Sequence, residues 1–480
     1  MILVCVSKDL SFGTEAGTNL TLLPFVPAAR EDGTLVLDPS RVYLALEETV
    51  QALTGVTMQQ GMPQPIRLAG ALLEQLPRRP QPLAALLRNP PRRQVRICLI
   101  NGGGGGLGDG ILSAPAFTVL GKRLHAATGA EPILVAYSML PQRTGAVLAG
   151  VPGLTVRPMP FSLAEFLGYD AVADLSGMLD DPLFHQTHMT DFVLARLGID
   201  PTEVPDAEKT PFLRLSRAVP DEVARGLGRA YAVAAGKPLV AVIFLSSYTR
   251  SLPEDKAARL LRRLAGADCQ PVLLFPEDHS VEAFMARHEL HGVAVDCSAA
   301  SRTFLDYFLL LAGMDAIVTV DTSAVHVGAA LGKPTVALFN SINMEYRIRY
   351  SPTVHGIQLA YQGRSCTAPC GLSKSRAFIQ GRLPDGKPFR LECGYACDEA
   401  VEREAILDAA ALAISRIDMT GDVAEQYEKI RQQMADRFHA SSAPCWDSLS
   451  EDEVVRSLIA LMEAAEDAAM VREVIHVGAE

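Results

Sequence analysis

One short stretch of the chain places hydroxyl side chains where a helix begins. Residues 318–339 read VTVDTSAVHVGAALGKPTVALF, and an apolar run stops there at Asp321-Thr322-Ser323. A helix pattern of small residues follows, and Pro334 opens a second apolar run. The first N–H groups of a helix lack partners, and the helix dipole favours negative charge beside them. The stretch therefore predicts an anion site, of the kind that holds phosphates.

A run of glycines marks a second candidate. Residues 101–110 read NGGGGGLGDG, between an apolar run and a helical pattern. Gly103, Gly105 and Gly108 satisfy the G-x-G-x-x-G spacing of dinucleotide sites, which five consecutive glycines do almost automatically. We do not expect a dinucleotide, because Asp109 would repel its phosphates at the helix start. The strand that follows also ends without an acidic residue for the ribose hydroxyls.

Asp109 is instead a functional candidate itself. A carboxylate near a helix N-terminus is held ionised by the dipole, and the glycines on either side, Gly108 and Gly110, leave room for a substrate. Such a group suits a general base that takes the proton of a hydroxyl. An ordinary helix-capping carboxylate has the same sequence signature, so both interpretations stay open.

Two further positions have alternatives of the same kind. His326 follows Ser323 by one turn, so it is either a ligand contact at the predicted anion site or a buried structural imidazole. Glu277 and Asp278 come directly after the predicted strand 272–275. Either carboxylate suits ribose hydroxyls, and either is equally consistent with an ordinary surface residue.

Four cysteines form a separate group late in the chain. They follow a C-x3-C, 22-residue gap, C-x3-C pattern in a glycine-rich segment with few apolar residues, and they are Cys366, Cys370, Cys393 and Cys397. A segment that cannot bury a core is stabilised by a metal, and four thiolates suit structural zinc or iron. Free thiols or a redox pair are the alternative. The other five cysteines are scattered, which is typical of small core residues.

Composition excludes several classes of protein. The chain has 480 residues, 49% hydrophobic and 21% charged, with a formal net charge of -11. An acidic chain does not favour nucleic acid as a partner, since phosphate binding needs clustered Lys and Arg. No apolar run reaches the roughly 20 residues that span a bilayer. We expect a cytoplasmic protein, because the N-terminus has no signal-peptide pattern and cysteine usage suits a reducing compartment.

The alternation of strand and helix patterns predicts an α/β fold. Two series of alternating runs indicate two Rossmann-like domains with parallel sheets, facing each other across a cleft. We predict an accessory α+β domain at 1–76, a Pro/Arg-rich linker at 77–94, a first Rossmann-like domain at 95–236, a second at 237–362, a cysteine finger at 363–400 and C-terminal helices at 401–480. The basic linker is expected to be solvated, with contact to an anionic surface as the alternative.

Two motifs together resemble glycosyltransferase family 9, the ADP-heptose transferases of the two-domain GT-B fold. GLGDGILSAPAFTVL, at 106–120, is similar to the family's Gly-Asp motif, and the stretch at 318–339 is similar to its Asp-Thr-Gly-x-x-His motif. A looser similarity lies in IFLSSYTRSLPED at 243–255. The sequence departs from the family pattern with Ser323 for Gly, Arg250 for Lys and Leu252 for Trp.

The resemblance implies a role for each of these positions. Asp109 is the proposed base on the acceptor side, which includes Gly108, and the reaction inverts the anomeric carbon. The groups that would bind the donor are Ser246, Ser247, Arg250, Glu277, Asp321, Thr322, Ser323 and His326. These hydroxyls, the guanidinium and the helix N-termini suit the leaving diphosphate, so no catalytic cofactor is expected. The cysteine finger is similar to that of the bacterial autotransporter heptosyltransferases.

The leading hypothesis is therefore transfer of a heptose from an ADP-heptose-type donor to a hydroxyl of a lipopolysaccharide core or a protein. A GT-B transferase with another nucleotide sugar is the first alternative. A catalytically silent binding or assembly subunit is the second. The expected partners are the donor and a glycan or protein acceptor, with no nucleic acid. Homo-oligomer contacts and peripheral membrane contact stay open.

Overall fold

The computed structural model describes most of residues 79–362 and parts of the chain on either side. The described residues are 2–5, 10–13, 19–23, 28–29, 35–36, 39–45, 50, 66–68, 79–102, 106–178, 181–215, 218–246, 250–275, 281–362, 367–369, 377–382, 388–393, 409, 411–418, 420–423, 425–430, 433 and 444–477. The chain divides into two compact units, Met1–Ser216 and Arg217–Glu480. Each unit is described by itself.

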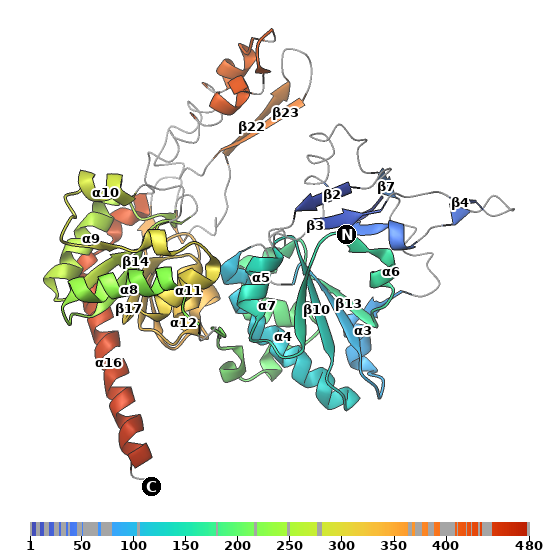
Figure 1. The fold of residues 1–480 in the computed structure, drawn as a ribbon, viewed down its shortest axis with the longest axis horizontal. Coiled ribbons are helices and arrows are strands. Elements are labelled where there is room, and N and C mark those ends of the chain that lie inside the picture. Colours follow the sequence, from blue (N-terminus) through green and yellow to red (C-terminus); the bar gives the residue numbers. More distant parts are fainter. Residues whose placement is uncertain are drawn as a thin grey trace. The chain divides into compact units, whose positions relative to one another are not determined.

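A five-stranded parallel sheet forms the centre of the first unit (Figure 1). Its strands are, in spatial order, β11 (Leu154–Pro158), β10 (Ile133–Ser138), β9 (Arg96–Ile100), β13 (Ala171–Asp174) and β8 (Gln81–Pro82). Both β9 and β10 are almost wholly buried, as expected for strands that helices cover on both faces. The sequence order reverses between β9 and β13. That is the point at which open α/β sheets bind ligands.

Helices connect the strands of this sheet. The main helix, α4 (Leu107–Thr128), packs against α5 (Pro141–Leu148) and α7 (Met189–Arg196). Shorter helices are α3 (Leu83–Arg88), α6 (Leu163–Phe166), and the 3-10 helices η3 (Pro182–His185), η4 (Pro201–Glu203) and η5 (Asp206–Lys209). Nearly every side chain from Ile111 to Leu120 is buried, so α4 is a core helix.

The N-terminal region shares a sheet with the rest of the first unit. This antiparallel sheet has the spatial order β12 (Phe161–Ser162), β6 (Tyr43–Ala45), β1 (Ile2–Cys5) and β7 (Ile66–Leu68). The other described elements of the N-terminal region are β2 (Leu10–Gly13), β3 (Asn19–Leu22), β4 (Ala28–Ala29), β5 (Leu35–Val36) and η1 (Pro39–Arg41). The apolar core that contains Val42 and Leu44 continues into the parallel sheet through Tyr137 and Phe161.

The segment predicted as a solvated linker contributes structure instead. Strand β8 extends the parallel sheet beside β13, and α3 buries Leu83 and Leu86. The arginine pairs and prolines of this segment flank the two buried leucines. The prediction rested on the prolines and arginines, which outnumber the few apolar residues of this short helix.

A six-stranded parallel sheet forms the second unit. The spatial order is β16 (Val295–Asp296), β15 (Gln270–Leu273), β14 (Leu239–Ile243), β17 (Ala316–Val320), β18 (Thr335–Phe339) and β19 (Val354–Gln358). The helices are α8 (Asp221–Ala234), α9 (Glu254–Gly266), α10 (Val281–Arg287), α11 (Phe304–Ala312), α12 (Ser323–Ala330), α13 (Glu345–Ile348), η7 (Ser298–Ala300), η8 (Pro444–Ser448) and α16 (Glu451–Val477). Here the order reverses between β14 and β17.

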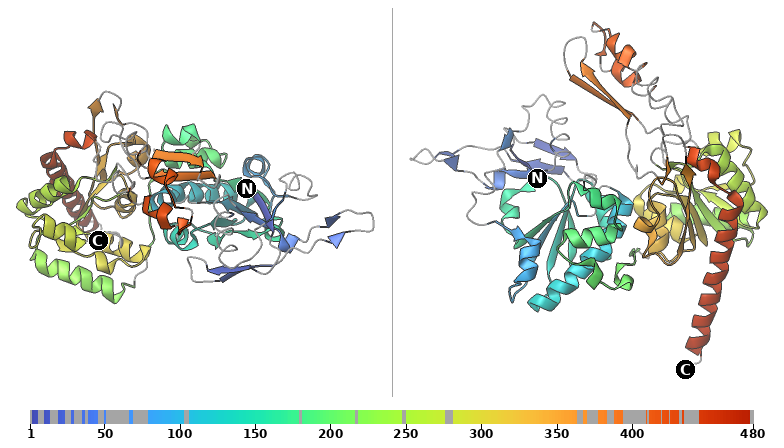
Figure 2. Two further views of the ribbon diagram at one scale, coloured as in Figure 1. Left: turned by 90° about the horizontal axis from the view of Figure 1, so that it is seen from above. Right: turned by 180° about the vertical axis from the view of Figure 1, so that it is seen from behind.

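Two helix layers cover this sheet. Helices α8, α11 and α12 pack together on one side, and α9 packs with α16 on the other (Figures 1 and 2). The N-terminal half of α16 buries Val454 and Leu458 in the same apolar cluster as Trp446 of η8, and the helix then continues beyond the sheet. The C-terminal segment therefore completes the core of the second unit.

Small hairpins precede the C-terminal helix. Strand β20 (Tyr361–Gln362) pairs with β21 (Thr367–Ala368), and β22 (Ala377–Arg382) pairs with β23 (Pro388–Cys393). Among the described residues, no helix is long and apolar enough to cross a membrane.

The strand and helix patterns predicted for residues 95–137 and 239–339 are confirmed within a few residues. The boundary between the units differs from the predicted 236/237 and lies at 216/217. Helix α8 belongs to the second unit because it packs against α11, β14 and β15.

Candidate functional site

The reversal point of the second sheet brings two segments of the predicted donor site together. Ser246 and Arg250 follow β14, whereas Asp321 follows the adjacent β17. The Ser246 hydroxyl donates to the Asp321 carbonyl oxygen at 3.0 Å, across 75 positions of sequence. The Ser251 hydroxyl donates to the Ser246 carbonyl oxygen at 2.7 Å and accepts from the Ser246 N–H at 2.9 Å. These bonds hold the turn after β14 against the start of α12.

An ion pair joins the same two segments. An Arg250 guanidinium nitrogen lies 3.1 Å from Asp321 Oδ2, and the side chains are 18% and 5% exposed, respectively. A buried carboxylate needs a cationic or hydrogen-bonding partner, and Arg250 supplies one. Asp321 was predicted to bind the donor. Its observed contact is with Arg250, so it positions a guanidinium at the mouth of the turn.

Helix α12 begins without a side-chain cap. Thr322, at the N-cap, is extended with φ -151° and ψ -179°, and its side chain makes no capping hydrogen bond. The Val325 N–H donates to the Thr322 carbonyl oxygen at 3.1 Å, whereas the N–H groups of Ser323 and Ala324 have no acceptor among the described residues, which suits an anion. Ser323 occupies the first helical position, and its side chain lies near Tyr307 of α11. Burial raises the pKa of Tyr307, and the nearby Ser323 side chain partly opposes the rise.

His326 is a buried imidazole in the first turns of α12. The residue is 5% exposed, and its Nδ1 atom has no hydrogen-bond partner among the described residues. Burial lowers the pKa of His326 to about 4; Asp321 opposes this shift, and Arg347 and Arg250 add to it. The imidazole is therefore neutral at pH 7. It would contact a ligand by hydrogen bonding and not as a cation.

Three residues of this region were missed at the sequence level. Tyr307 contacts Ser323 from α11, Arg347 of α13 is 8% exposed and influences His326, and Asn340 is 2% exposed directly after β18. The position of Asn340 at the carboxyl end of a predicted strand was a usable signal. Arg347 offered none, because nothing in the local pattern places it beside α12.

Asp109 lies at the reversal point of the first sheet. It occupies the third helical position of α4, and its Oδ2 atom accepts a hydrogen bond from the Gly106 N–H at 3.1 Å. This is the geometry of a capping carboxylate. Gly108 precedes it in the first turn. Close packing is also visible at Gly102, where a Cβ atom would lie 3.2 Å from the Cβ atoms of Leu99 and Ala136.

Several predicted site residues lie outside the described part of the chain. They are Ser247, Glu277, Asp278, Cys366, Cys370 and Cys397. Cys393 is described only as the last backbone position of β23. Among the residues the structure does describe, no three His, Cys, Asp or Glu side chains are grouped to hold a metal ion. Cys98, Cys269, Cys297 and Cys445 are buried, which confirms their prediction as core residues.

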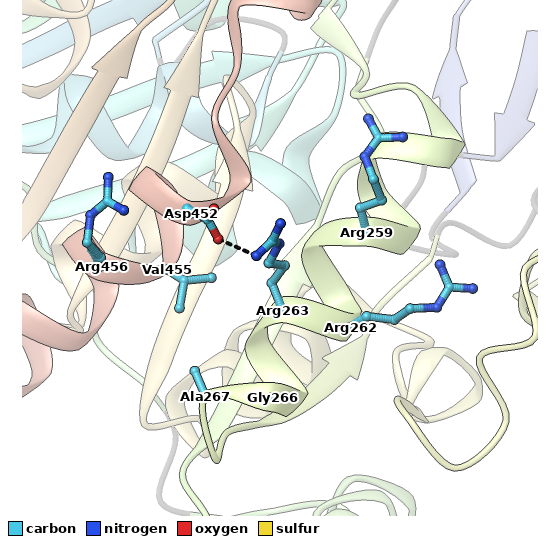
Figure 3. A pocket seen from close by; sticks show the side chains of 8 residues that line it. All are labelled: Arg259, Arg262, Arg263, Gly266, Ala267, Asp452, Val455 and Arg456. Carbon is cyan, nitrogen blue, oxygen red and sulfur yellow. Dashed lines mark ion pairs between the residues drawn. The ribbon is translucent and has the colours of Figure 1, made fainter.

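An arginine-lined groove lies elsewhere on the second unit, between α9 and α16 (Figure 3). Arg263 pairs with Asp452 at 2.7 Å, and Arg259 pairs with Glu451 at 3.0 Å. The four arginines of the groove do not converge on one point in Figure 3. Two of them connect α9 to the first turn of α16, which is a structural role.

The candidate site in the second unit combines a helix N-terminus, a partly buried hydroxyl–backbone contact and an Arg–Asp pair at the reversal point of a parallel sheet. The sequence model described as glycosyltransferase family 9 (heptosyltransferase) matches residues 187–374. The chain thus carries a glycosyltransferase family 9 domain and is a glycosyl-transferring enzyme. The match includes Ser246 to His326 and begins after Asp109.

The solved structures to which the chain is similar include three of related description. The ADP-heptose lps heptosyltransferase II of E. coli is 18% identical, with a TM-score of 0.43, over 55% of this chain and 90% of that one. A glycosyl transferase family 9 protein from Veillonella parvula is 16% identical, with a TM-score of 0.41, over 55% and 85%. TibC of enterotoxigenic E. coli, an iron-containing dodecameric glycosyltransferase, is 10% identical, with a TM-score of 0.40, over 90% and 98%. A comparison with curated protein sequences gave no match.

Proposed function

We propose that this enzyme transfers a heptose from an ADP-heptose-type donor to a hydroxyl of a lipopolysaccharide core or a protein, with inversion at the anomeric carbon. The observation that carries the proposal is the Arg250–Asp321 pair beside the uncapped start of α12. A nucleotide diphosphate leaving group gathers negative charge as its bond to the sugar breaks. A guanidinium, helix N–H groups and hydroxyls placed together stabilise that charge.

Residues of the second unit would bind the donor. Arg250 would contact a diphosphate oxygen while Asp321 fixes its side chain, and the N–H groups at the start of α12 would contact the other phosphate. Neutral His326 would donate or accept one hydrogen bond to phosphate or sugar. Thr322 and Ser323 add hydroxyl donors. Ser247 and Glu277 keep their proposed places on the phosphate and the ribose.

Asp109 in the first unit would act as the base for the acceptor hydroxyl. Its carboxylate would accept the proton of the acceptor hydroxyl as the new oxygen–carbon bond forms and the bond from the anomeric carbon to the diphosphate breaks. The Gly106 N–H bond supports this role, because a hydrogen bond to the charged carboxylate favours ionisation and fixes its orientation. The proposal requires the two units to face each other as in a GT-B enzyme.

Ligand binding and turnover test the proposal together. Calorimetric titration with ADP, UDP and GDP should give tightest binding with ADP, and Arg250→Met should weaken it by tenfold or more, as expected for a lost charge-assisted hydrogen bond of about 1.5–3 kcal/mol. Asp109→Asn should abolish sugar transfer while ADP affinity stays within twofold. Anomeric configuration of the product, read by NMR, checks inversion. Preference for UDP or GDP would support a different nucleotide sugar.

The four-cysteine pattern extends the proposal beyond the catalytic groups. We place a structural zinc or iron at Cys366, Cys370, Cys393 and Cys397, on the evidence of their spacing. Elemental analysis of purified protein should give about one metal per four-thiolate site, lost in Cys366→Ser with Cys370→Ser. The same preparation tests homo-oligomers by light scattering. A cytoplasmic location and peripheral membrane contact are tested by cell fractionation.

A further inference from the structure

A second cavity lies at the opposite end of the strands from the donor turn. It has a volume of about 640 Å³ and is bounded by the segments that precede β14, β17 and β18, the end of α8 and one side of α16. Its walls include Pro238, Leu331, Pro334, Met462 and Ala465, which are small or apolar. The proposed transfer reaction makes no use of this cavity.

Lys333 is placed rigidly in the wall of the cavity. It follows the C-terminus of α12, where Gly332 has a left-handed φ of 66°. The Lys333 N–H donates to the Gly328 carbonyl oxygen at 2.9 Å, and its carbonyl oxygen accepts from the Thr335 hydroxyl at 2.9 Å. With both backbone groups fixed, the side chain starts from a defined position.

The other charged groups around the cavity are already engaged or lie at its rim. Lys237 pairs with Asp268 at 3.0 Å, and the Asp315 carboxylate accepts the Leu239 N–H at 2.8 Å. The Tyr231 hydroxyl donates to the Gly313 carbonyl oxygen at 2.7 Å, and Glu466 is exposed.

Lys333 differs from these groups. Within the described part of the chain, its ammonium group has no ion pair or hydrogen bond. Burial lowers the pKa of Lys333, and the nearby Asp315 partly opposes this effect. A half-buried cation without a partner, next to apolar walls, is matched by an anionic group on a ligand.

We propose that this cavity binds a small monoanion in which a carboxylate or sulfonate is joined to an apolar body, with the anionic group against Lys333. The carboxylates of Asp315 and Glu466 border the same cavity, so a doubly charged phosphate meets more repulsion than a single carboxylate does. The apolar body packs against Leu331, Pro334 and Met462. The exposed ring of Tyr231 offers a further stacking surface.

Fluorine NMR of the full-length protein tests the proposal with 4-(trifluoromethyl)benzoate as the probe. The benzoate should bind at millimolar concentration, and its uncharged analogue, 4-(trifluoromethyl)benzyl alcohol, should bind at least tenfold more weakly. Lys333→Met should weaken benzoate binding by tenfold or more, whereas Lys333→Arg should retain it within a few-fold. Lys237→Met is the matched control, because that lysine borders the same cavity but is paired with Asp268, and it should change binding less than twofold.

Competition with ADP separates this site from the donor turn. Saturating ADP should leave benzoate binding unchanged, since the two sites lie at opposite ends of the same strands. Displacement by ADP, equal binding of the acid and the alcohol, or unchanged binding in Lys333→Met would each overturn the proposal. Trp446 fluorescence confirms that every variant is folded, because this buried residue is the sole tryptophan.

Discussion

The pairing of Arg250 with Asp321 is the feature on which the donor site most depends. We predict that Asp321→Asn lowers the free energy of unfolding of the second unit by about 2–3 kcal/mol. Removal of one partner from a fully buried pair costs about 3–5 kcal/mol, and exposed pairs contribute about 0–1 kcal/mol. The exposures of 5% for Asp321 and 18% for Arg250 place this pair between those limits, nearer the buried one.

A double-mutant cycle isolates the interaction from other effects of each substitution. Asp321→Asn, Arg250→Met and the double variant should give a coupling energy of about 1–2 kcal/mol. The exposed Arg259–Asp255 pair, with side chains 47% and 64% exposed, is the matched control in the same unit. It should give about 0.3–0.5 kcal/mol, as is usual for i,i+4 pairs on a helix surface.

Urea unfolding followed by Trp446 fluorescence is the assay. This residue is 1% exposed in the core of the second unit, so its signal reports the unfolding of that unit and not of the other. The midpoints should shift while the slopes with urea stay constant. A coupling energy for Arg250–Asp321 no larger than that of the control pair would refute the reasoning. The donor turn would then not depend on this ion pair.

Three further predictions use the same assay. The pKa of His326 is about 4 in the folded chain and 6.5 ordinarily, so the unfolded chain binds a proton at this imidazole first as the pH falls. The free energy of unfolding therefore declines between about pH 6.5 and 4, and His326→Gln should reduce this decline by up to about 3 kcal/mol. Gly328→Ala places a Cβ atom against Thr335 and 3.2 Å from Ile317 Cδ1 and should cost about 1–3 kcal/mol, whereas Gly228→Ala, with open space around it, should stabilise by about 0.5–1 kcal/mol. Leu458→Ala, which truncates a fully buried side chain of α16, should cost about 2–5 kcal/mol, and Asp452→Asn less than about 1 kcal/mol. Equal losses of unfolding free energy in Leu458→Ala and Asp452→Asn would mean that ion pairs, and not apolar contacts, hold α16 on the domain.

Local patterns were sufficient to predict the parallel sheets. The apolar runs that became β9, β14, β17 and β18 are long and β-branched, and turn residues bound each of them. The same patterns placed Asp109 and Asp321 beyond the carboxyl ends of strands; Asp321 directly follows β17, and Asp109 lies in the first turn of the helix that follows β9. Periodicity carries this information because it depends only on neighbours along the chain.

Contacts between distant segments were beyond the sequence. Asp321 was predicted as a ligand of the donor, and its partner turned out to be Arg250, 71 positions away. Arg347 and Tyr307 reach the site from other elements of the second unit, and nothing near them in sequence signals that. The short segment Leu83–Arg88 was predicted as linker because its two buried leucines are outnumbered by prolines and arginines.

The closing of the second core by η8 and α16 has a consequence for how this chain tolerates change. Ala368 and Cys445 both pack on the same apolar cluster, so the chain leaves this domain after Ala368 and returns to it at Cys445, and Cys370, Cys393 and Cys397 lie between these two positions. Closure entropy rises only slowly with length, by about 0.6 kcal/mol per doubling, so a change in the length of this segment should have a small thermodynamic cost for the domain. Removal of the residues after 443 should instead destabilise the domain. It takes Trp446, Leu449 and Leu458 out of the core, so the core of this domain depends on residues that are distant in sequence from its sheet.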